Sequence, residues 1–216
     1  MSQARIIHKV EYDPEAEPKV LPEGEVTFEE YLAWADEDIA AEWENGRIVL
    51  MSPAARVHQA LVRWLSTVLS LYVQHHDLGE VLIAPFAVRL RVSDQGREPD
   101  ILFVRTENLA RLKNTYLDGA ADLIIEIASP ESMMRDRGQK YIEYEAEGVT
   151  EYWLIDPQRR SAEFHRLGDD GRYQPILPQN HVYHSAVVPG FSLDVRRLWQ
   201  DPLPSELDVL RQLGVI

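Results

Sequence analysis

The sequence predicts an α/β fold, also describable as α+β, in which a mixed β-sheet carries a long helix on each face. Two segments have apolar residues at helical spacing, and short apolar or alternating segments of strand length lie between and after them. With 216 residues, 45% of them hydrophobic, the chain can bury a substantial core. We expect a flexible N-terminal segment at 1–24, one domain at 25–195 and a helical tail at 196–216.

The first expected elements are a short helix and a hairpin. Thr27 and Glu30 have the spacing of a capping box, which predicts a helix through FEEYLAWAD. The segment AAEWENGRIVLM then predicts two strands about Asn45-Gly46, because a two-residue hairpin turn needs positive φ at both positions and prefers this dipeptide.

Apolar periodicity predicts the longest helix from Ala55 to Asp77, with Gly79 in the position of a C-terminal cap. A second long helix is expected through RGQKYIEYEAE, ending at Gly148, and a terminal helix at SELDVLRQLG. A short helix is expected at ENLARL. Strands are expected at VLIAPF, AVRLRV, DILFV, LIIEIA, EYWLIDP, AEFHRL, RYQPI and HVYHSAVV.

The composition limits the kinds of function. Without cysteine the chain cannot form disulfides, thiolate zinc sites or cysteine nucleophiles, so any metal needs oxygen or imidazole ligands. A net charge of −14 argues against coating nucleic acid by bulk electrostatics, although a local basic groove is compatible with it. No segment reaches the roughly 18 apolar residues of a membrane span, and no signal sequence is evident. We expect a cytoplasmic protein without a membrane partner.

Two acids and a lysine on the predicted elements indicate a catalytic site. Glu126 interrupts an apolar strand, where an unpaired carboxylate is costly and needs a cation or hydrogen-bond donors. Asp100 begins another strand, and a helix returning antiparallel to its strand would bring Lys140 beside Glu126. Carboxylates that hold Mg²⁺, with a lysine to orient water, could hydrolyse a phosphodiester. The alternative is a structural ion pair between Glu126 and Lys140.

Four blocks of the sequence resemble a known family. ENGRIVLMSP with His58, GREPDILFV, LIIEIASP and RDRGQKYIEYEAEGVTEYWLIDP are similar to the signature blocks of the Uma-two family of restriction endonucleases, within the PD-(D/E)XK nuclease superfamily. The resemblance covers approximately Thr27 to Asp194. It implies a restriction-endonuclease-like core and a Mg²⁺- or Mn²⁺-dependent endonuclease that acts on DNA.

The resemblance also implies roles for single residues. Asp100 matches the acid of the superfamily's PD element, and Glu126 matches the acid of its second element. The usual lysine position is occupied by Ala128, and Lys140 matches the lysine that this family carries on the next helix. Asp100, Glu126 and Lys140 are therefore the expected catalytic residues.

The same resemblance implies a set of metal ligands, namely Asp100, Glu126, Glu42 and the main-chain carbonyl of Ile127. Glu42 is the weakest of these, because Glu44 faces the same side of its strand. Three cationic or titratable residues are candidates for contacts with the DNA backbone, with local packing or solubility as the alternative: His58, Arg135 and Arg137.

Three further hypotheses stay open. A homodimer would supply two sites for the two DNA strands, and Leu207, Leu210 and Leu213 of the terminal helix could dock on the partner. A nuclease-like module that binds nucleic acid or protein without turnover is favoured by the acidic charge and by Ala128. A glycosidase using Asp100 and Glu126 as paired acids would need no metal.

Overall fold

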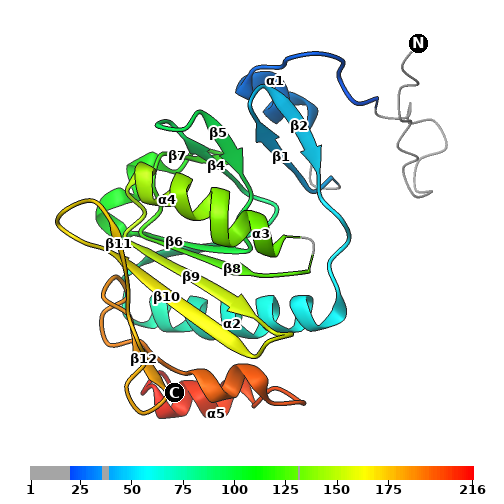
Figure 1. The fold of residues 1–216 in the computed structure, drawn as a ribbon. Helices are drawn as coiled ribbons and strands as arrows, with labels where there is room; N and C mark the ends of the chain where they lie inside the picture. The colour runs from blue at the N-terminus through cyan, green and yellow to red at the C-terminus, as the bar shows by residue number, and fades with distance from the viewer. Residues whose placement is uncertain (1–19, 36–38, 131) are drawn as a thin grey trace.

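The computed structural model describes residues 20–35, 39–130 and 132–216 (Figure 1). Its helices are α1 (Phe28–Trp34), α2 (Arg56–His75), α3 (Met133–Arg135), α4 (Tyr141–Glu147) and α5 (Glu206–Gln212), with 3₁₀ turns at Thr106–Arg111 and Val195–Trp199 and a π-helical turn at Asp136–Lys140. Its strands are β1 (Ala41–Glu44), β2 (Arg47–Leu50), β3 (Gly79–Ile83), β4 (Ala87–Leu90), β5 (Gln95–Arg97), β6 (Ile101–Arg105), β7 (Tyr116–Asp118), β8 (Leu123–Ile127), β9 (Glu151–Asp156), β10 (Ser161–Leu167), β11 (Tyr173–Pro175), β12 (Val182–His184) and β13 (Ser192–Asp194).

A six-stranded mixed sheet with the order β11-β10-β9-β8-β6-β3 forms the centre of the molecule. Its β8 and β9 are parallel, and its other neighbouring strands are antiparallel. In Figure 1, α2 covers one face of this sheet and α4 covers the other. The predicted fold class, a mixed sheet flanked by helices, is confirmed.

The expectation of one sheet was incomplete. A second sheet, ordered β2-β1-β5-β4-β7, lies beyond α4, and β12 and β13 form a small ribbon. The sequence analysis did not predict β5, β7 or β13, which have only three residues each. Such short strands show too few residues for an alternating pattern to stand out.

Alternation along β8 sends its side chains to two different cores. Leu123, Ile125 and Ile127 pack in the core under α2, whereas Ile124 packs in the core under α4. Glu126 has the same parity as Ile124 and therefore faces the α4 side. The sheet thus delivers this acid toward the helix that follows it.

Local turn signals were predicted correctly in three places. The capping box of Thr27 and Glu30 is present, and Asn45-Gly46 turns between β1 and β2 with φ of 48° and 76°. Gly148 ends α4 with φ of 92°. The first helix was expected to run to Asp36, but it ends at Trp34 and Ala35 is already extended. Asp36 and the N-terminal segment up to residue 19 lie outside the described residues.

The prediction that Gly79 caps the C-terminus of α2 was wrong. The helix ends at His75, and Asp77 takes the left-handed conformation with φ of 52°. Gly79 instead opens β3 with φ of 148°, where an added Cβ would collide with the main-chain oxygen of Val104. Glycine is needed there because two backbones approach closely.

The terminal helix α5 packs on its own chain. Val209 and Leu210 are buried in the core that α2 shares with the central sheet. Leu210 is therefore not available as a dimer contact, which corrects that part of the homodimer hypothesis, whereas Leu207 is 54% exposed. Within the described ranges, no helix is both long and apolar enough to cross a membrane.

The close approach at Gly79 gives a stability prediction. Gly79→Ala should lower the free energy of unfolding by more than about 3 kcal/mol, because the new methyl must displace backbone. Gly148→Ala is the matched control, since its φ is also positive but nothing lies within 4 Å of the added Cβ. That change should cost only about 1 kcal/mol. Urea unfolding of both variants checks this, and equal losses would contradict the steric explanation.

Candidate active site

Asp100 and Glu126 meet across the junction of β6 and β8. These strands pair with Ile101 opposite Ile125 and Leu102 opposite Ile124, so the next pair in this register is Asp100 opposite Glu126. Directly opposed side chains on antiparallel strands point to the same face, with Cβ atoms about 5 Å apart. Two like charges at that separation repel each other, so the pair needs a compensating cation.

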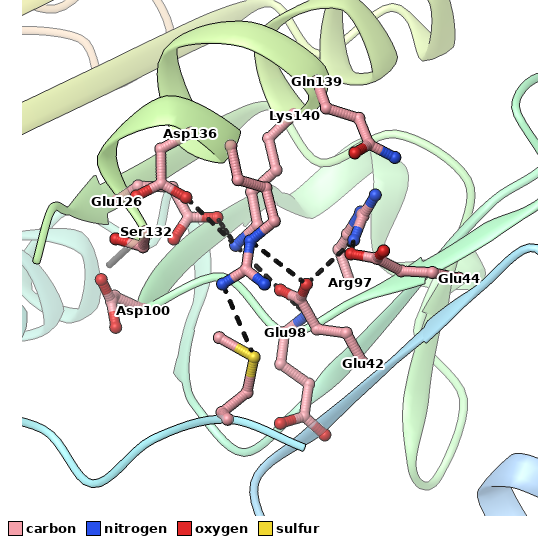
Figure 2. Close-up of polar contacts among 12 residues, drawn as sticks. Glu42, Glu44, Arg97, Glu98, Asp100, Glu126, Ser132, Asp136, Gln139 and Lys140 are labelled. Carbon is pink, nitrogen blue, oxygen red and sulfur yellow. Dashed lines mark hydrogen bonds and ion pairs between the residues drawn. The ribbon is translucent and has the colours of Figure 1, made fainter. Parts of the chain in front are cut away.

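Lys140 supplies one positive charge at this place (Figure 2). Its Nζ lies 2.8 Å from Glu126 Oε1 and 2.8 Å from Glu42 Oε1, and its side chain is 2% exposed. Burial lowers the pKa of Lys140, but the surrounding carboxylates of Glu126, Glu42 and Asp136 outweigh burial and raise it above its usual value. The carboxylates therefore favour the charged, ammonium form of Lys140.

A π-helical turn brings Lys140 to the sheet. The segment from Asp136 to Lys140 joins α3 to α4 and has one residue more per hydrogen-bonded turn than an α-helix. Asp136 and Lys140 are both buried within this turn, and Asp136 Oδ1 lies 3.7 Å from Lys140 Nζ. Turns of this kind are rare and are frequent at functional sites.

Glu126 is held by two donors from the helix that follows its strand. Lys140 Nζ and the Tyr144 hydroxyl both donate to Oε1 at 2.8 Å, so neither hydrogen bond uses Oε2. Burial raises the pKa of Glu126, and the neighbouring carboxylates of Asp136 and Asp100 add to this, against the opposing charge of Lys140. The site holds more carboxylates than one ammonium can balance.

Asp136 is a buried acid, and one of its oxygens accepts no hydrogen bond in the described chain. It is 1% exposed, and the oxygen concerned is Oδ1. Burial raises the pKa of Asp136, while Lys140 and Ser132 act in the opposite direction. A buried carboxylate oxygen without a donor is unusual in a native protein and indicates a missing ligand, water or proton.

Glu42 lies on the other side of Lys140, away from Asp100 in the view of Figure 2. Its Oε1 faces Lys140, and its Oε2 accepts a hydrogen bond of 2.9 Å from Arg97. Burial raises the pKa of Glu42, but Lys140, Arg97 and Arg135 lower it to about 2 overall. Both oxygens of Glu42 are thus engaged by cations.

Arg97 on β5 anchors this acidic group from behind. It is fully buried and donates at 2.7 and 2.9 Å to the two oxygens of Glu143 on α4. It also bonds Glu42 and forms an ion pair with Glu44. One guanidinium on β5 therefore ties β1 of the same sheet to α4, beside Lys140.

Asp100 has partners of its own. Its Oδ2 accepts a 2.7 Å hydrogen bond from the main-chain N–H of Ile127, and His58 Nε2 lies 3.1 Å from Oδ1. Burial lowers the pKa of His58, but Asp100 outweighs burial and raises it above its usual value. His58 therefore contacts the predicted catalytic acid directly.

The two arginines before Lys140 have different positions. Arg135 is 23% exposed at the edge of the cluster, with Nε 4.0 Å from Glu42. Arg137 instead pairs with Glu163 on β10 and takes no part in the cluster. Of the residues predicted to contact DNA, His58 and Arg135 adjoin the carboxylates and Arg137 does not.

Sequence reasoning missed three members of this site. Arg97 stands in the quoted block GREPDILFV, but its three-residue strand was not recognised. Tyr144 was interpreted as core packing, and it is fully buried, but its hydroxyl also bonds Glu126. Asp136 is the third residue that was missed. The i, i+4 spacing of Asp136, Lys140 and Tyr144 places them on one face of a helix, and this signal could have found Asp136 and Tyr144.

The donor set fits a hard divalent cation. Magnesium and manganese prefer oxygen ligands, and magnesium commonly uses only one or two carboxylates while keeping several waters. The register of β6 and β8 places the carboxylates of Asp100 and Glu126 side by side, and Asp136 adds an oxygen that accepts no hydrogen bond within the described residues. In residues 20–35, 39–130 and 132–216 no group of three or more histidine, aspartate or glutamate side chains is placed so that it could hold a metal ion by itself. Water and substrate oxygens would have to complete the coordination.

The mixed sheet and the acid–lysine cluster at its edge define the restriction-endonuclease-like class of nucleases. The chain belongs to the Uma2 family, whose model is described as "Putative restriction endonuclease" and matches residues 28–196. Membership of this family supports a nuclease function. A search of curated proteins found no match.

The fold is also found in a solved structure from Anabaena variabilis ATCC 29413, described as "a putative nuclease belonging to DUF820". The TM-score is 0.66 at 20% sequence identity, and the match covers 81% of this chain and 97% of that one. At this identity the similarity establishes the shared fold alone.

The buried position of Arg97 predicts a large effect of its removal. Arg97→Gln should lower the free energy of unfolding by about 3–5 kcal/mol, because Glu42 and Glu143 lose their charge partner in the interior. Arg137→Gln is the control, since its pair with Glu163 is exposed and should contribute at most about 1 kcal/mol. Guanidinium unfolding measures both, and a small effect at Arg97 would show that the framework tolerates unpaired acids.

Proposed function

We propose that this protein is a Mg²⁺- or Mn²⁺-dependent endonuclease that hydrolyses phosphodiester bonds in DNA. The proposal rests on the register of β6 and β8, which when extended by one pair places Asp100, just before β6, opposite Glu126, and on the Lys140 ammonium 2.8 Å from Glu126. Carboxylates gathered in the interior are unfavourable without enough compensating cations, and Glu42, Glu126 and Asp136 all share the one Lys140 ammonium.

Asp100 and Glu126 would hold the metal ion, together with the main-chain carbonyl of Ile127. The Ile127 N–H is already tied to Asp100 Oδ2, which fixes the end of β8 against the start of β6. A bound divalent ion polarises a phosphoryl oxygen and makes water more nucleophilic at neutral pH. The two strands position the acids before the substrate arrives, so little reorganisation is needed.

Lys140 would act through its charge. Its raised pKa keeps the ammonium protonated, so it does not serve as a general base that removes a proton from water. It can hold Glu126 in place and stabilise negative charge that develops on the phosphate. Glu42, with both oxygens bound to cations, is better suited to positioning Lys140 than to holding the metal.

The DNA backbone would approach the cluster past His58 and Arg135. His58 lies at the start of α2, and Arg135 lies at the edge of the cluster with part of its side chain in solvent. Cationic side chains at these places can contact phosphate oxygens and orient the strand. Arg137 would have to leave Glu163 before it could contribute in the same way.

A second candidate is a nuclease-like module that binds nucleic acid without cleaving it. The observation that favours it is the complete engagement of Lys140, whose ammonium faces Glu126, Glu42 and Asp136 at once. Cleavage assays separate the two candidates, because the module would bind DNA and leave it intact. A glycosidase would work without a divalent ion, so dependence on metal excludes that reading.

Cleavage by single-site variants tests the nuclease. Asp100→Asn, Glu126→Gln and Lys140→Met should each reduce the rate of cutting supercoiled or single-stranded DNA by at least about 100-fold with Mg²⁺ or Mn²⁺, because each removes a charge that acts in the transition state. Gel assays of initial rates measure this. Circular dichroism and thermal melts show whether each variant is folded.

Exposed residues of the same kinds provide controls for these variants. Lys113→Met removes an exposed lysine whose Nζ donates to the main-chain oxygen of Ala110, and Asp208→Asn removes a solvent-exposed acid paired with Arg211. Both should cut at the rate of the unmodified chain. Unchanged cleavage in the folded Asp100→Asn and Lys140→Met variants would refute the assignment.

Metal binding can be measured independently of cleavage. Mn²⁺ at 100 times its dissociation constant should stabilise the unmodified chain by about 2.7 kcal/mol, seen as a rise in Tm. Asp100→Asn should abolish this rise and Asp208→Asn should leave it unchanged. Absence of any metal-dependent rise, confirmed by calorimetry, would favour the binding module.

A further inference from the structure

A pocket of about 450 Å³ lies outside the acid–lysine cluster, and its volume is in the range of small-molecule sites. It lies between the start of α2, the turn after β9 and the segment that joins the last 3₁₀ turn to α5. Its charged and aromatic lining residues are Arg56, Arg63, Arg160, Trp199, Asp201 and Glu206. None of the residues assigned to the candidate active site lines it.

Two arginines in this pocket, Arg56 and Arg160, differ from most basic residues of the described chain because their side chains have no ion pair or hydrogen bond. In the described ranges, nearly every arginine and lysine side chain has an ion pair or hydrogen bond, and the exceptions are Arg47, Arg56 and Arg160. Two of these three exceptions line one pocket. In a protein with a net charge of −14, unpaired guanidinium groups collected in one place indicate a site for an anion.

The remaining lining groups define the kind of anion. Arg63 and Glu206 neutralise each other at 2.5 Å, so the charge balance rests on Arg56 and Arg160 against Asp201. Trp199 adds a half-buried aromatic side chain. Guanidinium groups bind phosphate, and an aromatic ring can stack on a base.

The pocket lies at the same end of the central sheet as the acids. Arg56 is two residues before His58, which contacts Asp100, and Arg160 follows β9, the parallel neighbour of the strand that carries Glu126. Figure 1 places the start of α2, the turn between β9 and β10 and the segment before α5 at this end of the molecule. The first turn of α2 holds no acidic residue that would repel an anion.

We propose that this pocket binds a nucleotide, with its phosphate on Arg56 and Arg160 and its base against Trp199. The nucleotide is either a free mononucleotide or one unit of a single strand that extends from the neighbouring active site. The pocket depends on its own side chains, so nucleotide binding does not require the metal or the cleavage reaction.

Equilibrium binding of fluorescently labelled dAMP and of a labelled 12-nucleotide single-stranded DNA, both in EDTA, tests the proposal. The double variant R56Q/R160Q should weaken binding at least about 10-fold for the ligand that uses the pocket, and Trp199→Leu should also weaken it. R47Q is the matched control, because Arg47 is likewise unpaired but lies on β2 outside the pocket, and it should change nothing.

The two ligands identify the source of the nucleotide. Binding of dAMP that is lost in R56Q/R160Q assigns the pocket to a free nucleotide. Binding of the 12-mer alone, with the slope of log K against log salt concentration reduced by about 0.7 in the double variant, assigns the pocket to a strand, since one lost phosphate contact on single-stranded DNA reduces the slope by that amount. Either result supports the proposal.

Three results would overturn it. These are equal binding by R56Q/R160Q and R47Q, no binding of either ligand, or binding that inorganic phosphate displaces fully while Trp199→Leu has no effect. The arginines are exposed and unpaired, so the double variant should keep the Tm of the unmodified chain. Binding is measured in EDTA and cleavage with Mg²⁺ or Mn²⁺, so a failed nuclease and a failed pocket give different results.

Discussion

The interaction on which the rest of the structure depends is the contact of one buried ammonium with two carboxylates from different sheets. Lys140 joins Glu42 of the outer hairpin to Glu126 of the central sheet, and Arg97 ties the same hairpin to α4. Buried charges of this kind contribute little net stability, since their removal from water costs about as much as their attraction returns. Their retention in the interior is better explained by what the cluster does than by what it stabilises.

The two faces of β8 lie in different environments, one apolar and one charged. Ile125 and Ile127 face α2 and pack in an uninterrupted apolar core, whereas Glu126 faces the charged layer between the sheets. Because successive side chains of a strand point to opposite faces, the charged side chain does not disturb the apolar core behind it. A rigid apolar face behind the acids limits their movement, which a preorganised site requires.

The sequence was sufficient to predict Lys140 beside Glu126, because Glu126 interrupts the apolar pattern of β8 and Lys140 lies on the helical segment that follows it. It was not sufficient for Arg97, because three residues of strand carry no readable period and the chain gives no sign that β5 pairs with β1. The roles of Glu42 also depend on pairing between distant segments. Such contacts follow from tertiary packing, which local pattern does not encode.

The extra residue in the π-helical turn has a consequence for how this chain can change in length. An insertion or deletion between Asp136 and Lys140 would turn every following residue about the helix axis by roughly 100°. Lys140 and Tyr144 would then leave Glu126 together, because both follow the turn on one continuous helix. Length variation in this segment is therefore far more damaging than in the exposed turn at 168–171, although the two differ little in size.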